Sequence, residues 1–308
     1  MRTCFLPFLA LPLAACASGD AAKDSAGGGS TVRTFADFVD VQTPWTGDST
    51  CFDGTNFSTA VPDPSCQQPI TLSGVVSDFE KETPVGGAAV QLWEADAVAG
   101  AADTVLAADA GGAFSTEVQA CTPFAYGTST PVEWAVTVDT YEIHQLYGFD
   151  GSGGAEDAFN SVSIATSRVI AGLIGVDWDP STAIIAGKAY DCALAPIQYA
   201  QVYLHDAEGN PPATGDIYYF TANGGTDLPA QRAIQPHTNT NGLWVAMNVP
   251  PGSWIVELWA WDATAGAHVL LGKSPLDVAA GAVTVSNLYT GEDDGVFYPA
   301  NCLQACGG

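Results

Sequence analysis

The sequence predicts an all-β protein made of two tandem antiparallel β-sandwiches, joined by a segment that contains one short helix. Two observations lead to this fold class. Alternating apolar residues are interrupted by frequent turn residues, since the 308-residue chain contains 33 Gly and 19 Pro but only 14% charged residues. In addition, one pattern of strand and turn residues occurs twice along the chain, which indicates an internal duplication.

The amino terminus has the pattern of an export signal. Arg2 supplies one positive charge, and residues 5–14 form an apolar run. As a helix this run would be about 15 Å long, half of the hydrocarbon thickness of a bilayer. That length is typical of a signal peptide and too short for a membrane span. No later stretch is long and apolar enough to span, so we expect no transmembrane helix.

The signal ends in Leu13-Ala14-Ala15-Cys16, which resembles the lipobox of bacterial lipoproteins. The resemblance implies that residues 1–15 are removed and that acyl chains on Cys16 attach the mature chain to a membrane. Ala17 at the next position implies the outer membrane of the cell envelope. An ordinary secretory cleavage around Ala15-Cys16-Ala17 is the alternative.

The next two segments are predicted to connect the anchor with the folded part. Residues 16–32 are small and polar, with Gly27-Gly28-Gly29-Ser30 at their centre, and predict a flexible tether. Residues 33–68 predict an irregular lead-in, because they contain several prolines together with Cys51 and Cys66.

The cysteine count fits an oxidising compartment. Cys4 leaves with the signal and Cys16 carries lipid or is lost, so an even number remains: Cys51, Cys66, Cys121, Cys192, Cys302 and Cys306. In an exported chain, these six predict up to three disulfides. The pair Cys51–Cys66 is favoured because it is local, and the other connectivities stay open. A zinc site at Cys302 and Cys306 would lack a second pair of ligands nearby.

A first β-sandwich is expected over residues 69–150. Apolar runs separated by turn residues predict strands at 72–76, 90–93, 114–118 and 134–138, and residues 141–154 are predicted to be loop. The connecting segment, residues 151–182, should contain the helix. Side chains recur there at spacings of three and four, before Gly175: Phe159, Val162, Thr166, Val169 and Leu173.

The second β-sandwich is expected over residues 183–290, and the repeat supports it. Three segments of the first copy align in order with three of the second: Gly74–Phe79 with Gly187–Cys192, Pro84–Leu92 with Pro196–Leu204, and Gly112–Phe114 with Gly242–Trp244. In each copy a glycine opens a strand, a proline sets the re-entry after a turn, and alternating apolar residues face a core. Residues 291–308 form a C-terminal tail.

This order of residues resembles the carboxypeptidase regulatory-like domain, a transthyretin-like β-sandwich. The second copy carries the resemblance through residues 187–204, 240–244 and 249–256, although Ala189 stands where the pattern has Val. The first copy lacks the Val-Pro-Pro-Gly step and matches less well. The resemblance implies an accessory module of an exported protein, serving adhesion, carbohydrate contact or spacing, and it implies no chemistry.

The charge balance disfavours nucleic acid as a partner. The chain has 8 basic and 34 acidic residues, a net charge of −26, and such a surface repels nucleic acid and anionic lipid. Cations are the remaining charged ligands. Two glycine-rich acidic loops place oxygen atoms close together, as Ca²⁺ prefers, without the spacing of a known calcium loop. We favour solvated acidic loops and expect no cofactor; in the alternative, a structural calcium site, the candidate ligands are Asp150, Asp157, Glu292, Asp293 and Asp294.

Catalytic motifs are absent from the sequence, so we expect a protein that is not an enzyme. Residues 90–96 also resemble the start of intradiol ring-cleavage dioxygenases, which bind iron through Tyr and His. The histidines here are scattered, which disfavours that site: His144, His205, His237 and His268. An enzyme whose site assembles across space stays an alternative.

Aromatic residues of the second copy are the candidate ligand-binding residues: Trp244, Trp254, Trp259 and Trp261. Trp259 and Trp261 alternate with Ala260, so both should face one side of a strand. An exposed stripe would bind sugar rings or a protein, whereas a buried stripe would be core, which we favour. We therefore expect a non-catalytic, lipid-anchored module of the cell envelope that binds an envelope protein or glycan or has a structural role. A carbohydrate-binding surface protein is the alternative.

Overall fold

The computed structural model describes residues 41–52, 57–96, 98, 100–129, 139–148, 158–223 and 226–306. Within them it confirms the predicted all-β fold class, with strands β1–β16 and one α-helix, α1. The lipobox with Cys16, the tether, the strand predicted at 134–138, and Asp150 and Asp157 lie outside the described residues. No helix in the described part is long and apolar enough to cross a membrane.

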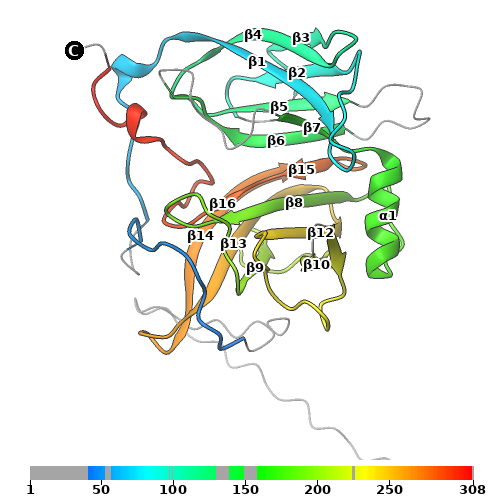
Figure 1. The fold of residues 1–308 in the computed structure, drawn as a ribbon, viewed down its shortest axis with the longest axis vertical. Coiled ribbons are helices and arrows are strands. Elements are labelled where there is room, and N and C mark those ends of the chain that lie inside the picture. The colour runs from blue at the N-terminus through cyan, green and yellow to red at the C-terminus, as the bar shows by residue number, and fades with distance from the viewer. Residues whose placement is uncertain are drawn as a thin grey trace, which may run out of the picture. The chain divides into compact units, whose positions relative to one another are not determined.

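Two sheets form the first sandwich (Figure 1). In one sheet the order is β4-β1-β7, and in the other it is β3-β2-β5-β6. Their strands are β1 (Pro69–Asp78), β2 (Ala89–Trp93), β3 (Thr104–Ala107), β4 (Ala113–Gln119), β5 (Phe124–Ser129), β6 (Asp139–Gln145) and β7 (Ala158–Ser161). The two sheets enclose a core that includes Leu72, Val76, Val90, Leu92, Phe114 and Phe159.

The loop predicted at residues 141–154 was wrong at its beginning, where the structure has β6. The strand has no clear apolar alternation because it lies between two other strands and buries polar side chains. Thr140 and Glu142 are both buried, and each has a partner: Thr140 accepts from the backbone of Val162, and Glu142 accepts from the hydroxyl of Tyr126. A pattern that relies on apolar residues misses such a strand.

The helix prediction was right about existence and end but wrong about the start and the buried face. Helix α1 (Ile164–Ile174) begins after Ser163, whose hydroxyl accepts from the backbone of Thr166, and Gly175 ends it at φ 75°. Phe159 belongs to β7 instead. Val169 and Leu173 are 50% and 44% exposed, because the helix buries its small and hydroxyl side chains: Thr166, Ser167 and Ala171, together with Ile174.

The second sandwich packs the sheet β11-β10-β12-β8 against the sheet β14-β13-β9 (Figure 1). Its strands are β8 (Ala183–Tyr190), β9 (Ala200–His205), β10 (Asp216–Asn223), β11 (Thr226–Ala230), β12 (Leu243–Val249), β13 (Gly252–Asp262) and β14 (Ala267–Val278). Buried aliphatic and aromatic side chains from both sheets fill the core, with Trp244, Tyr219 and Leu258 among the largest.

The two copies of the sequence repeat have the same register in the structure. Gly74 pairs with Phe114 between β1 and β4, and Gly187 pairs with Trp244 between β8 and β12. A Cβ would lie 3.2 Å from the ring of Phe114 at Gly74 and 2.9 Å from the ring of Trp244 at Gly187, and still closer to Phe159 and to the carbonyl of Ser286, respectively. This agreement in pairing supports the duplication that the sequence indicates.

Strand β15 (Val283–Val285) joins the two sandwiches into one sheet. It runs parallel to β8 of the second sandwich and also parallel to β6 of the first. A 10-stranded sheet therefore continues from one sandwich into the other (Figure 1). The short strand β16 (Leu288–Tyr289) then pairs with the end of β8.

The six described cysteines form three disulfides between segments that are distant in the sequence, within the predicted limit of three. The favoured local pair Cys51–Cys66 was wrong. The pairs are Cys51–Cys192, Cys66–Cys306 and Cys121–Cys302, with sequence separations of 141, 240 and 181 residues. The first attaches the lead-in to the turn after β8, and the other two attach the C-terminal tail near the first sandwich. Proximity along the chain does not decide the pairing, because the lead-in passes from one sandwich to the other.

Candidate functional site

The four predicted ligand-binding tryptophans do not form one exposed stripe. Trp244 and Trp259 are 1% and 7% exposed, whereas Trp254 and Trp261 are half-buried. Trp244 lies in the core of the second sandwich. The indole of Trp259 donates to Glu257 at 2.9 Å, and that carboxylate lies 3.2 Å from Nε2 of His205. Two of the four indoles are therefore too enclosed to stack on a ligand.

The described acidic residues that were candidates for calcium have separate partners. Asp294 accepts from the backbone of Val296 at 2.9 Å and from the hydroxyl of Tyr298 at 3.2 Å. Asp293 lies 3.5 Å from the ammonium of Lys273. Among the residues that the structure describes, no group of three or more His, Cys, Asp or Glu could hold a metal ion.

Glu292 should make the free energy of unfolding depend on pH. Burial, and then the charge of Asp294, raise its carboxyl pKa to about 7, although a hydrogen bond from Ser58 opposes the rise. Stability is therefore lost as the pH increases from the unfolded pKa near 4.5 to about 7. We expect Glu292→Gln to increase the free energy of unfolding at pH 8 by about 1 kcal/mol, allowing for partial exposure, and to change nothing at pH 4. Urea unfolding at both pH values measures this, and a destabilisation at pH 8 would contradict it.

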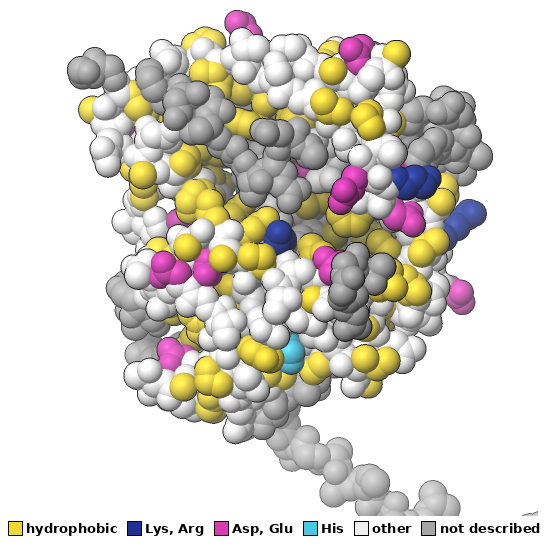
Figure 2. Space-filling view, viewed as in Figure 1, with side chains coloured by type: hydrophobic (Ala, Val, Ile, Leu, Met, Phe, Trp, Pro, Cys, Tyr) yellow, Lys and Arg dark blue, Asp and Glu magenta, His cyan; other side chains and the backbone are white. Residues whose placement is uncertain are grey.

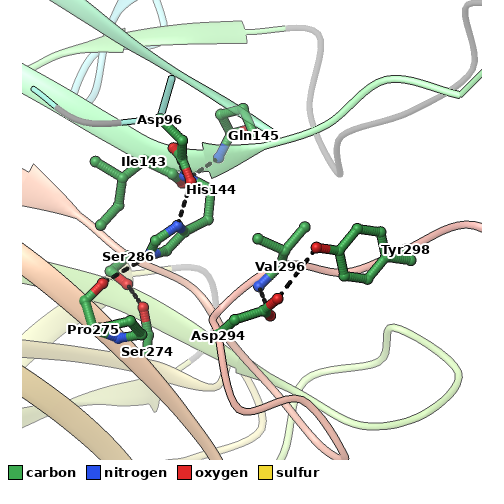
Figure 3. A network of polar contacts seen from close by, with 10 residues as sticks. All are labelled: Asp96, Ile143, His144, Gln145, Ser274, Pro275, Ser286, Asp294, Val296 and Tyr298. Atoms are coloured by element: carbon green, nitrogen blue, oxygen red, sulfur yellow. Dashed lines mark hydrogen bonds and ion pairs between the residues drawn. The ribbon is translucent and has the colours of Figure 1, made fainter. Parts of the chain in front are cut away.

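A histidine in β6 connects the two sandwiches (Figure 3). Nδ1 of His144 lies 2.6 Å from Oδ2 of Asp96, in the loop after β2. The backbone N–H of His144 also donates to Oδ1 of Asp96, at 2.7 Å. On the other side of the ring, Nε2 lies 2.9 Å from the carbonyl oxygen of Pro275 in β14. We call these three residues, Asp96, His144 and Pro275, the His144 clasp.

The backbone around the clasp is shaped to hold it. Asp96 and His144 have φ angles of 56° and 60°, in the left-handed region that non-glycine residues adopt at a cost. Gly295 covers the imidazole, at φ 80°. A Cβ there would lie 2.6 Å from Cδ2 of His144 and would overlap the hydroxyl of Ser274, so glycine is required. The local strain is sustained because three segments of the chain meet at this ring.

The His144 clasp links the two sandwiches, and its geometry does not suit proton transfer by the imidazole. A histidine that acts as a general base needs one ring nitrogen directed at its substrate. In this structure a carboxylate and a carbonyl oxygen engage both nitrogens of His144, and two such acceptors favour the imidazolium, which donates from both. When His144 is protonated, its ring therefore donates to the first sandwich through Asp96 and to the second through Pro275.

His144 should also make the free energy of unfolding depend on pH. Burial lowers its pKa, but the hydrogen bond and charge of Asp96, the carbonyl of Pro275 and the charge of Asp294 together raise the pKa above its ordinary value. The stability that the clasp contributes is then complete below pH 6.5 and is lost as the pH rises through the raised pKa. We expect His144→Gln to lower the free energy of unfolding by about 2 kcal/mol at pH 6, and by less at pH 9.

Urea unfolding of wild type and variant at each pH tests this prediction. Subtracting the free energy of unfolding of the variant from that of the wild type at each pH cancels the contributions of Glu292 and of other groups that both proteins contain. An equal loss at pH 6 and pH 9 would contradict a clasp that depends on the imidazolium.

A pocket of about 250 Å³ lies beside the clasp, where the two sandwiches meet. We call it the junction pocket. It is lined by Asp96, Val98, Ile143, His144, Ala207, Ser253, Trp254, Ile255, Pro275, Leu276 and Asp277. A second cavity of about 530 Å³ lies along α1, with Arg168 and Trp178 in its wall. Trp254 is thus the one predicted ligand-binding residue in the wall of either of these pockets.

Asp96, His144 and Asp277 were not among the site residues predicted from the sequence. Asp96 and His144 are 48 positions apart, and Pro275 lies a further 131 positions along the chain from His144. No spacing motif joins residues at such separations, and a lone histidine carries little information. The strand order β2-β5-β6 brings Asp96 close to His144, and the pairing of β6 with β15 brings the second sandwich, with Pro275, to the same ring.

No model of a protein family matches the sequence, and no curated protein matches it either. Three solved structures illustrate the similarities found. The Bacillus anthracis TIE protein is 10% identical with a TM-score of 0.22, and the match covers 72% of this chain but 33% of that protein. The shaft pilin SpaA from Lactobacillus rhamnosus GG is 8% identical over 73% of this chain and 98% of its own, with a TM-score of 0.21. BcpA, the major pilin subunit of Bacillus cereus, is 10% identical over 74% and 100%, with a TM-score of 0.22. This chain spans about a third of the length of the first. At these identities and TM-scores, the similarities say nothing about activity, ligand or partner.

Proposed function

We propose that this protein is a non-catalytic, lipid-anchored module of the cell envelope, whose role is structural or to bind another envelope component. The observation that carries the proposal is the cross-linking of distant segments by three disulfides, with separations between 141 and 240 residues. Such bonds form and persist in oxidising compartments outside the cytoplasm. Disulfides of this kind are therefore expected in an exported module.

The connections between the sandwiches support a structural role. The shared strand β15, the His144 clasp and the tail disulfides all limit movement of one sandwich against the other. A body with fixed internal geometry suits a spacer or a display platform. The engaged nitrogens of His144 support the non-catalytic part of the proposal, because neither is directed at a substrate in the junction pocket.

The lipid anchor is tested by metabolic labelling with a palmitate analogue in a bacterial host that processes lipoproteins. We expect label on the wild-type chain and none on Cys16→Ser, with a shift of the variant from the membrane to the soluble fraction. Cys4→Ser is the matched control, because Cys4 lies in the predicted signal and should not affect labelling. Label that persists in Cys16→Ser would show that the chain is not anchored through this residue.

The binding role is tested with a glycan array and with a pull-down from envelope extracts, each with and without Ca²⁺. Capture of a defined envelope protein supports the proposal. Specific retention on glycans would favour the carbohydrate-binding alternative, which must then use Trp254 or Trp261, since Trp244 and Trp259 are buried.

A further inference from the structure

The junction pocket combines an apolar lining with a negatively charged rim. Its apolar side chains come from both sandwiches: Val98 and Ile143 from the first, and Trp254, Ile255 and Leu276 from the second. Its charged side chains are Asp96, His144 and Asp277. Two carboxylates against one imidazolium leave the pocket negative even when His144 is protonated.

Asp277 is the carboxylate best placed to meet a ligand. It is exposed on β14, directly opposite Ser253 of β13, and the Ser253 hydroxyl donates to its Oδ1 at 2.5 Å. That hydrogen bond orients the carboxylate at the rim of the pocket. Asp96 differs, because His144 engages both of its oxygens.

Trp254 contributes an aromatic surface to the same pocket. Its Nε1 donates to the carbonyl oxygen of Pro250 at 2.9 Å, which fixes the orientation of the half-buried indole. The face of an indole attracts cations through cation–π interaction, and it also makes apolar contacts with methylene groups. An aromatic surface, a fixed carboxylate and aliphatic walls thus surround one small volume.

We propose that the junction pocket binds a primary alkylammonium group on a short aliphatic stem, as found in a lysine side chain or a small diamine. The aliphatic walls receive the methylene groups, and Asp277 and Trp254 receive the ammonium. The charge of the whole chain agrees, since a net charge of −26 concentrates cations near the surface and repels anions. Figure 2 shows acidic side chains at many separate places on one face. A neutral sugar would find few polar groups for its hydroxyls in this pocket.

This inference goes beyond the proposed function and does not depend on the lipid anchor. Isothermal titration of the full chain in non-ionic detergent with n-butylammonium tests it, with n-butanol as the neutral analogue of the same shape. We expect a Kd on the order of 1 mM for the cation and at least about tenfold weaker binding of the alcohol. Equal binding of cation and alcohol, or no binding of the cation, would overturn the proposal.

Variants locate the binding in the pocket. Asp277→Asn should weaken n-butylammonium binding about tenfold, and Trp254→Phe should weaken it less while keeping an aromatic ring. Asp227→Asn is the matched control, because Asp227 is an exposed acid on β11 that does not line the pocket, and it should bind as the wild type does. A loss of binding in Asp227→Asn equal to that in Asp277→Asn would show a general charge effect and no site.

Tighter binding of a Gly-Lys-Gly peptide than of 1,4-diaminobutane would assign the ligand to proteins, and the reverse order would assign it to small diamines.

Discussion

Replacement of Cys121 and Cys302 by alanine should lower the free energy of unfolding by about 2–5 kcal/mol, the largest effect that we expect from the disulfides. Both cysteines are 0% exposed and lie in a cluster with Cys66, Leu146 and Val296. Their bond closes a separation of 181 residues, so its loss releases a long loop in the unfolded chain. It also removes two buried sulfurs from a packed cluster, which adds a cavity.

Urea unfolding of the double variant, compared with wild type, measures the loss. Ser73→Ala with Ser115→Ala is a matched double control, because these exposed hydroxyls lie 3.1 Å apart across β1 and β4 without a covalent bond. The control should stay within about 0.5 kcal/mol of wild type. A Cys121→Ala and Cys302→Ala protein as stable as this control would show that the tail disulfide contributes nothing to the fold.

Gly187→Ala should destabilise the protein by about 3 kcal/mol through the junction of the two sandwiches. A Cβ on Gly187 would overlap the backbone carbonyl of Ser286, just after β15, and would lie 2.9 Å from the ring of Trp244. Ser286 has little room to move, since its N–H donates to the carbonyl of Ala186 at 2.8 Å and its hydroxyl bonds Ser274 at 2.7 Å. The strain should therefore displace β15 from its position between β6 and β8.

Two measurements test this prediction: urea unfolding, and hydrogen exchange of the backbone amides in β15 and β6. We expect lower stability together with faster exchange at both strands. Gly172→Ala is the matched control, because a Cβ at this exposed position of α1 would meet nothing within 4 Å. It should raise stability by about 0.5–1 kcal/mol through helix propensity. Unchanged exchange in β15 would show that Gly187 is not needed for the junction.

The repeat was readable in the sequence because its glycines, prolines and aromatics recur in the same order in both copies. Gly74 and Gly187 each stand opposite an aromatic ring, and that need recurs wherever the same pair of strands is formed. The fold class and the presence of three disulfides followed from equally local or compositional features. Strand β6 was missed, because a strand between two neighbours can bury Thr140 and Glu142 with hydrogen-bond partners that no local pattern reveals.

The sequence by itself predicted the elements of this protein: two copies of a sandwich, a helix that ends before Gly175, and six cysteines outside the predicted signal and lipobox. Only the tertiary structure decided how these elements meet. Disulfide partners, the His144 clasp and the junction pocket all depend on contacts between residues 48 to 240 positions apart. The contacts between the two sandwiches form where β15 pairs through its backbone on both sides at once, with β6 and with β8. The position of β15 between β6 and β8 depends on the packing of the whole sheet, so no single segment of the chain encodes it.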